Sequence, residues 1–436
     1  MKRALLLMAT MTAIGFAAPA VAQTVAITGG TVALGDGSAP IPNGTVVFSN
    51  GRIVAAGAGV AAPAGATVID ATGKWVAAGI VAGPSELGLA DAAGVAESND
   101  AAARTSPFSA GLDVAATINP DAVAIGNERV GGVTRAIVAP RAVSSIFGGQ
   151  GAVIDLGADA QPLTRAHAFQ YVELGEDGGK LAGGSRPAAF AMFRDALTQA
   201  QDYRRNPAGF DGRGKDSLLK RADAQALLDM MDGKVPMMVH VERASDIRAV
   251  LGLTRDYPKL KLVLVGATEG WMVAREIAAA KVPVIASALA DLPAAFENLA
   301  ATESNVGRMT AAGIPVAIST IGVNDAAGEH ILKQFAGNLV AIARVPGATG
   351  LDWGKAFASI TSKPAEALAM GDELGSLRPG RRADVVIWSG DPLELASLPQ
   401  AVWIDGVSQP MVSRQTRLRD RYITPQEGAL PKAYSY

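Results

Sequence analysis

The organisation of this chain is decided near its C-terminus by the stretch GSLRPGRRADVVIW, residues 375–388. Its second half, Ala383–Trp388, is an apolar, β-branched run that is followed by the turn residues Ser389–Pro392, and it predicts a strand. A second strand is expected at Ala401–Ile404. The C-terminal part of the chain therefore contributes a small β block.

The N-terminal part of the chain is β-rich as well. Thr45–Phe48 and Arg52–Val54 flank the Asn50-Gly51 pair, which predicts a hairpin because both residues tolerate the positive φ of a type I′ turn. Neither β block has enough strands for a core of its own. We therefore expect the two blocks to pair in one small β-sandwich built from both ends of the chain.

The centre of the chain alternates short apolar runs, such as Met237–Val241 and Leu260–Val265, with helical patterns, such as Pro187–Tyr203 and Ala244–Thr254. Repeated strand–helix units over about 250 residues favour a parallel barrel. An open doubly wound sheet would need a G-x-G-x-x-G loop after its first strand, and residues 79–84 do not supply one. The predicted division is a signal peptide (1–22), the first part of the sandwich (23–77), the barrel (78–370), the second part of the sandwich (371–412) and a C-terminal extension (413–436).

Composition excludes several classes of function. The 436 residues are 49% hydrophobic and have a net charge of −2, so most of the chain is expected to fold. The 39 Lys and Arg residues are balanced by 41 Asp and Glu residues, which argues against a nucleic-acid partner. Three histidines and no cysteine exclude disulfides, thiol catalysis and a histidine-rich metal cage.

The first residues have the pattern of a cleaved signal peptide. Lys2 and Arg3 form a basic region, Leu5–Phe16 is apolar, and Ala20-Val21-Ala22 is a small-residue cleavage site. A membrane anchor is the alternative, but the apolar run is shorter than the ~20 residues of a span and Pro19 interrupts the residues after it. We expect export to the periplasm or secretion, with no membrane span in the mature chain.

Three motifs occur in order along the chain, and they are Asp70–Lys74 leading to Gly79–Val81, Ile360-Thr361 with Pro364–Leu368, and Gly375–Gly380 followed by Ala383–Val386. Together they resemble signatures of the amidohydrolase superfamily, closest to its secreted imidazolonepropionase-like branch. The resemblance implies an α/β fold with a TIM-like (β/α)8 barrel of amidohydrolase type and a small β-sandwich. It also implies descent from metal-dependent hydrolases that act on non-peptide C–N bonds.

The metal ligands that the resemblance implies are largely substituted. The family's first H-x-H motif corresponds to Pro84 and Glu86 in this chain, and a later histidine position corresponds to Gly266. The final aspartate position corresponds to Ile321, and His240 is the one usual ligand that remains. No lysine is placed to serve as a carboxylated bridging ligand. We therefore predict a degenerate member of the family, a pseudoenzyme candidate that has lost the binuclear metal site and needs no cofactor. Such a protein is either a binding or accessory protein or an enzyme of altered chemistry.

An alternative keeps the chain as an enzyme. Glu86, His240 and Glu242 have the donor atoms to hold one Zn²⁺ or Mn²⁺, with Glu269 as general base. The competing interpretation, which we favour, pairs the two acids with Arg243 or another cation and makes His240 a core residue. Glu269 is then a helix N-terminal acid rather than a catalytic residue.

Three further residues are candidates for substrate binding. Gln150 lies in a Gly-Gly-Gln-Gly loop that resembles the family's substrate-side loop, and it is equally consistent with a tight turn. Arg243 and Ser319 each lie next to the end of a predicted barrel strand. A small-molecule ligand is compatible with this set.

The prediction from sequence is thus an exported protein of amidohydrolase type, degenerate at its metal site. The alternatives are an active mononuclear hydrolase and a non-catalytic binding or complex-forming protein of the cell envelope. In the last case the protein acts as a homo-oligomer or with an envelope partner, and the charged segment 414–436 wraps a partner subunit or the barrel.

Overall fold

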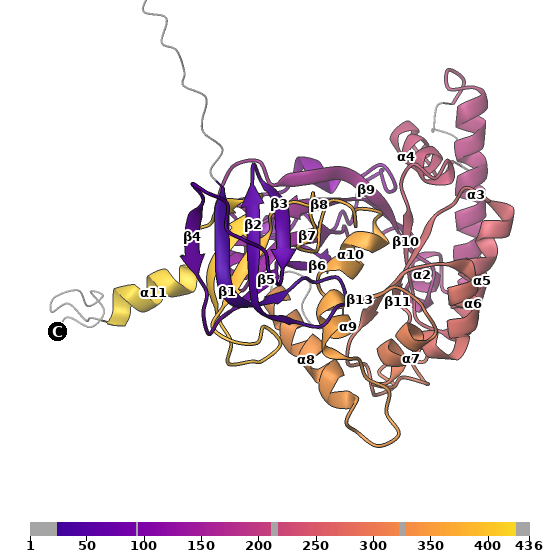
Figure 1. The fold of residues 1–436 in the computed structure, drawn as a ribbon. Coiled ribbons are helices and arrows are strands. Elements are labelled where there is room, and N and C mark those ends of the chain that lie inside the picture. The colour runs from indigo at the N-terminus through magenta and orange to yellow at the C-terminus, as the bar shows by residue number, and fades with distance from the viewer. Residues whose placement is uncertain (1–23, 93–94, 211–216, 322–327, 424–436) are drawn as a thin grey trace, which may run out of the picture.

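The computed structural model describes residues 24–92, 95–210, 217–321 and 328–423, and the predicted signal peptide lies outside these ranges. Two eight-stranded sheets form the framework, and most helices gather around the second sheet (Figure 1). The predicted α/β fold, with a barrel and a β-rich domain, is confirmed.

The first sheet joins the two ends of the described chain. Its strand order is β16-β15-β14-β5-β1-β2-β3, and β4 pairs with β1. Val76 on β5 lies opposite Ile387 on β14, so the two β blocks meet at this pair of strands. The strands are β1 (Val25–Ala33), β2 (Ile41–Ser49), β3 (Arg52–Gly57), β4 (Thr67–Asp70), β5 (Trp75–Ala78), β14 (Val385–Trp388), β15 (Pro399–Ile404) and β16 (Val407–Ser408).

The predicted hairpin connects β2 and β3. Ser49 pairs with Arg52, and the two residues between them, Asn50 and Gly51, have φ of 52° and 73°. Positive φ at both central residues is the requirement of a type I′ turn. The Asn-Gly signal is therefore confirmed.

The second sheet is the barrel, with strands in the order β13-β12-β11-β10-β9-β8-β7-β6. All neighbours are parallel except that β8 is antiparallel to both β7 and β9. Segments 139–146 and 156–162 join these three strands, and they are too short for the crossover of a dozen or more residues that parallel strands need. The strands are β6 (Ile80–Ser85), β7 (Val133–Val138), β8 (Phe147–Asp155), β9 (Leu163–Glu173), β10 (Met237–Val241), β11 (Leu262–Gly266), β12 (Val284–Ser287) and β13 (Val316–Ser319).

The gap between the first and last barrel strands is bridged by backbone from a helix end. The amide of Ile318 on β13 donates to the carbonyl of Ser359 at 3.0 Å, and the amide of Val81 on β6 donates to the carbonyl of Ile360 at 2.9 Å. Residues 359–360 thus satisfy polar groups on both edges that would otherwise be buried unpaired.

Helices cover the outside of the barrel, and α3 to α6 form one side of it (Figure 1). Helix α5 shows why: Ile247, Val250 and Leu253 are fully buried at a spacing of three, whereas Arg248 is exposed. Each such buried aliphatic side chain contributes about 1.5–3 kcal/mol. The helices are α1 (Val123–Val130), α2 (Glu176–Leu181), α3 (Arg186–Arg205), α4 (Arg221–Met231), α5 (Ala244–Asp256), α6 (Ala274–Ala280), α7 (Asn305–Ala311), α8 (Leu332–Ile342), α9 (Trp353–Ala358), α10 (Ser362–Ala367) and α11 (Arg414–Ile423).

A buried arginine ties the barrel to the first sheet. Arg135 on β7 is fully buried, with Nε 2.8 Å from Asp384 Oδ2 and Nη2 2.8 Å from Asp405 Oδ1. Its Nη1 lies 3.5 Å from Asp155 Oδ2. Burial raises the pKa of Asp155 to about 6, although the charge of Arg135 opposes this rise. The position of the barrel relative to the sheet therefore depends on buried charge.

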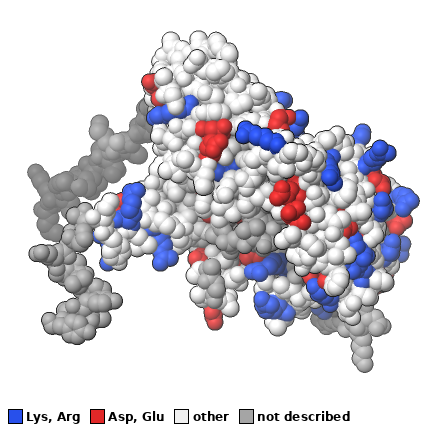
Figure 2. Space-filling view, turned by 90° about the horizontal axis from the view of Figure 1, so that it is seen from below, with Lys and Arg blue, Asp and Glu red and all other residues white. Residues whose placement is uncertain are grey.

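In the described part of the chain, no helix has the length and apolar character needed to cross a bilayer. On the face seen in Figure 2, Lys and Arg side chains are interspersed with Asp and Glu side chains, in keeping with the balanced composition.

Candidate functional site

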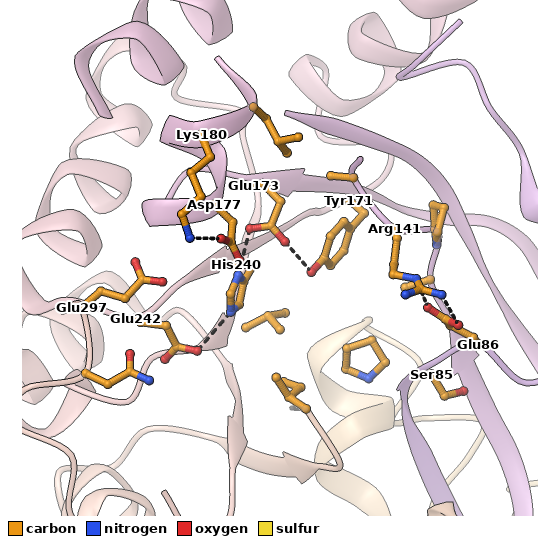
Figure 3. Close-up of a pocket in the computed structure, with 18 residues that line it drawn as sticks. Ser85, Glu86, Arg141, Tyr171, Glu173, Asp177, Lys180, His240, Glu242 and Glu297 are labelled. Atoms are coloured by element: carbon orange, nitrogen blue, oxygen red, sulfur yellow. Dashed lines mark hydrogen bonds and ion pairs between the residues drawn. The ribbon is translucent and has the colours of Figure 1, made fainter. Parts of the chain in front are cut away.

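A cavity of about 570 Å³ opens at the carboxyl ends of the barrel strands, where the sites of barrel enzymes lie. Its ionisable lining residues are Glu86, Arg141, Glu173, Asp177, Lys180, His240, Glu242 and Glu297 (Figure 3). Its apolar lining residues are Pro84, Ala139, Pro140, Ala142, Leu181, Val265 and Ile321. Three of the sequence-predicted residues, Glu86, His240 and Glu242, therefore reach the same cavity.

His240, on β10, lies between two carboxylates. Its Nδ1 is 2.8 Å from Glu173 Oε2 and its Nε2 is 3.0 Å from Glu242 Oε1 (Figure 3). Burial by itself lowers the pKa of His240, but the two carboxylates outweigh burial and raise the pKa well above its ordinary value of 6.5. The two contacts therefore favour the protonated imidazolium, which can donate a hydrogen bond from each nitrogen.

Glu242 is held on both oxygens. Its Oε1 faces His240, and its Oε2 accepts a hydrogen bond from the amide of Thr268 at 2.8 Å. Burial raises the pKa of Glu242, yet the bonds from His240 and Thr268 outweigh it and lower the pKa below its ordinary 4.5. Glu242 is thus a fixed anion.

Gly266 explains why this carboxylate fits. The residue has a φ of +84°, and a Cβ at this position would collide with both carboxylate oxygens of Glu242. By resemblance, position 266 is one that the family fills with histidine. Here the carboxylate of Glu242 lies in the space that such a side chain needs, so a side chain at position 266 would require Glu242 to move.

Glu173 and Tyr171 complete the cluster and were not identified from the sequence. Glu173 ends β9 directly opposite His240 on β10, and the Tyr171 hydroxyl donates to Glu173 Oε1 at 3.1 Å. An acid at the carboxyl end of an alternating strand was a visible signal. The pairing of β9 with β10, which places Glu173 beside His240, could not be inferred from the sequence.

Glu86 lies on the other side of the cavity from His240 (Figure 3). Its nearly buried carboxylate contacts Arg141, with Nε to Oε1 at 2.5 Å and Nη2 to Oε2 at 3.1 Å. The expected partner cation is therefore Arg141 and not Arg243. Arg243 instead donates to Asp246 Oδ1 at 2.9 Å at the start of α5.

Glu269 accepts hydrogen bonds from the amides of Ala244 at 2.9 Å and Ala300 at 3.1 Å. Its carboxylate thus caps the start of α5, as expected for a helix N-terminal acid, and also fixes the loop at Ala300. Glu269 is absent from the lining of the cavity.

The remaining predicted binding residues also lie away from the cavity lining. Gln150 is inside β8, where its backbone amide donates to the carbonyl of Leu112 at 2.7 Å. Ser319 is buried, and its hydroxyl oxygen accepts from the amide of Ile321 at 3.2 Å. The Arg243 side chain turns to Asp246.

The donor set of the cavity does not suit the metal centre that the resemblance implies. A protonated imidazole has no free lone pair for a metal. Glu86 is paired with Arg141 on the side of the cavity away from His240. The other positions where the family has metal ligands carry Pro84, Gly266 and Ile321. Within the described ranges, no group of three or more His, Asp or Glu side chains is arranged to hold a metal ion.

The cavity is acidic overall. Five carboxylates line it against Arg141, Lys180 and protonated His240. Glu297 Oε2 accepts from Arg186 at 3.3 Å, but Arg186 also contacts Glu176 and Asp246 and so is shared among three acids. Burial raises the pKa of Glu297.

Comparison with known proteins identifies related chains. Residues 234–415 match the amidohydrolase family. The chain is 24% identical over 381 residues to amidohydrolase tasK of Hapsidospora irregularis, a match that covers 80% of this chain and 37% of that protein. It is 28% identical over 227 residues to an imidazolonepropionase of Maricaulis maris, covering 52% of this chain and 51% of that protein. The chain thus spans about a third to a half of the length of these relatives.

Solved structures share the fold. An amidohydrolase from Thermotoga maritima superposes with a TM-score of 0.76 at 24% identity, covering 88% of this chain and 99% of that one. A molinate hydrolase superposes with a TM-score of 0.52 at 17% identity, covering 95% and 99%. At these identities the likeness concerns the architecture alone.

Proposed function

We propose that this chain, which carries an amidohydrolase family domain, has exchanged the metal centre of its family for a charged His–carboxylate cluster and binds a small ligand at the barrel mouth. The match to this family supports hydrolysis of C–N bonds as the ancestral activity. The observation that carries the proposal is that both ring nitrogens of His240 are hydrogen-bonded to carboxylates.

Metal binding at His240 requires the hydrogen bonds of the cluster to change. The metal would have to displace a proton from an imidazolium that two carboxylates stabilise. It would also have to draw Glu242 away from the Thr268 amide. Each step opposes binding, so the cluster disfavours the metal-bound state.

The mononuclear alternative needs Glu86 as a third ligand. Glu86 is bound to Arg141 on the opposite side of the cavity, so the three donors do not converge on one point. Breaking that pair would leave the positive charge of Arg141 facing the incoming cation. This arrangement supports a site without metal.

The lining favours a particular kind of ligand. Apolar residues such as Ala139, Pro140 and Ile321 suit an uncharged hydrocarbon body, and the excess of carboxylates suits a positively charged or hydrogen-donating head group. Glu297 is the carboxylate best placed to bind such a head group, because Arg186, which contacts it, is shared with Glu176 and Asp246. We propose a small organic amine as the ligand class.

Export is the proposed location, supported by the basic, apolar and small-residue pattern of residues 1–22, which lie outside the described ranges. Intact-mass measurement of the protein recovered from the periplasm tests this. A chain that begins at Gln23 is the expected result, and a full-length cytoplasmic chain contradicts it.

The test of the function combines metal analysis with an activity screen. Protein purified without chelators or a histidine tag is soaked with Zn²⁺ or Mn²⁺, its metal content is measured by mass spectrometry, and amides, cyclic ureas and dipeptides are screened as substrates. We expect metal well below stoichiometry and no hydrolysis. About one metal ion per chain, lost in His240→Ala and kept in the surface control His167→Ala, together with hydrolysis, would establish the mononuclear enzyme instead.

A further inference from the structure

Helix α11 (Arg414–Ile423) extends from the body of the protein at the end of the described chain (Figure 1). None of its residues is buried. Leu418, Tyr422 and Ile423 are 40%, 67% and 71% exposed, which is unusual for apolar side chains on one helix. The helix therefore presents an apolar surface that the described chain does not cover.

A helix of this length does not sustain itself in water. Isolated helices shorter than about 12–15 residues are marginal, because most helical stability in proteins comes from packing of an apolar face. Helix α11 has 10 residues and no buried face. Within the described chain its main contact with the body is with α1, and most of its surface is left open.

The side chains of α11 form two adjacent stripes. Arg414, Arg417 and Arg421 follow one another at spacings of three and four, and Leu418 and Tyr422 follow at a spacing of four. The stripes touch, since the guanidinium of Arg421 lies 5.6 Å from the ring centre of Tyr422. One face of the helix is thus apolar along its middle and basic along its edge.

Charge sets this helix apart from the rest of the molecule. Four arginines and Asp420 give α11 a charge of +3, and the whole chain has −2, so the other residues together carry −5. Arg419 contacts Asp420 at 2.6 Å, whereas Arg414, Arg417 and Arg421 form no ion pair with any residue that the structure describes. In Figure 2, α11 lies at the left of the view and carries several blue side chains.

We propose that α11 docks this protein on an anionic lipid surface, with Leu418 and Tyr422 in the interface and the three arginines on the lipid phosphates. Arginine side chains extend along an apolar boundary while their charged ends reach the head groups, and tyrosine suits the same boundary. A protein partner would need a groove that fits this particular helix, whereas a fluid anionic surface needs only the two adjacent stripes. The proposal is independent of the ligand at the barrel mouth.

The experiment is co-sedimentation of the full chain with vesicles of one part phosphatidylglycerol and three parts phosphatidylcholine, and with phosphatidylcholine vesicles alone. The test variant is R414Q/R417Q/R421Q. The control R194Q/R204Q/R205Q removes three exposed arginines from α3, each of which forms an ion pair at the surface. Both variants lose the same charge, so only the position differs.

The wild type and the control are expected to bind the anionic vesicles alike. An arginine near an anionic surface is worth about fivefold in binding, so the test variant should bind roughly 100-fold more weakly. L418S/Y422S should also weaken binding. Equal binding of the test variant and the control, or no binding by the wild type, overturns the proposal. So does a concentration-dependent dimer, seen by light scattering without vesicle binding and lost in L418S/Y422S, which assigns the stripe to a second copy of the chain.

Discussion

Removing the charge of Glu173 while keeping its shape, in Glu173→Gln, tests whether His240 is an imidazolium held by two anions. The His240 and Glu173 side chains are 15% and 11% exposed, and Nδ1 and Oε2 are 2.8 Å apart. At an effective dielectric constant near 20, two unit charges at that separation attract by about 6 kcal/mol. Desolvation offsets part of this attraction, and Glu242 still neutralises His240 in the variant. We therefore expect the free energy of unfolding at pH 7 to fall by about 3 kcal/mol, the lower end of the cost of breaking a buried ion pair.

The assay is urea denaturation of the wild type, Glu173→Gln and the control Glu276→Gln. Glu276 forms an ion pair with Arg248 in which both side chains are about half exposed, so the control should lose less than about 1 kcal/mol. A loss in Glu173→Gln no larger than in the control would show that His240 is neutral, and would refute the reasoning.

The same cluster gives the stability a defined pH dependence. The folded-state pKa of His240 is raised above its ordinary 6.5, so its contribution is fully present below pH 6.5 and is lost as pH rises through the raised value. The folded-state pKa of Glu242 is lowered below 4.5, so its contribution is present above pH 4.5 and is lost at lower pH. The deficit of Glu173→Gln relative to the wild type should shrink at alkaline pH, where His240 loses its proton.

The structure supports three further predictions. Gly266→Ala should lower the free energy of unfolding by at least about 2 kcal/mol more than Gly313→Ala, as measured by urea denaturation. Both glycines have a φ near +85°, but only at Gly266 would the added Cβ meet a side chain, that of Glu242. Equal losses would mean that Glu242 does not fill the space beside Gly266. Asp155→Asn should raise the melting temperature at pH 8 and increase the free energy of unfolding by about 1–3 kcal/mol. The folded-state pKa of Asp155 is raised from 3.8 to about 6, so its carboxylate costs stability as pH rises through that range. No gain in stability at pH 8 would show that Arg135 fully compensates the charge of Asp155. Small aromatic amines should raise the melting temperature more than the matching alcohols, and Glu297→Gln should reduce that difference. Equal effects of amines and alcohols would show that the cavity does not recognise the positive charge of the ligand.

Much of the fold could be predicted from local sequence. The Asn50-Gly51 turn, the apolar run of β10 and the motif beginning at Gly375 each specify local structure, and their order along the chain specifies the architecture. The antiparallel strand β8 could not be predicted, because its apolar pattern is the same in either direction.

The candidate site was predictable only in part. His240 lies on β10 and Glu242 directly follows the end of that strand, two residues on, so their side chains point to the same side. Glu173 and Arg141 are far from them in sequence, and their approach depends on strand pairing and on the course of a loop. Sequence spacing carries no information about either contact. Glu269 shows the reverse case, since the sequence made it a candidate general base and the structure binds both of its oxygens to backbone amides.

The protonation state of His240 tests the central claim most directly. The chain has three histidines, so nitrogen-15 NMR of selectively labelled protein, with His240→Gln to assign the signal, resolves its two ring nitrogens. At pH 7.5 we predict two protonated nitrogens in His240, unchanged by a stoichiometric addition of Zn²⁺. A neutral ring with one bare nitrogen that shifts when Zn²⁺ is added would contradict the account and restore a metal site at the barrel mouth.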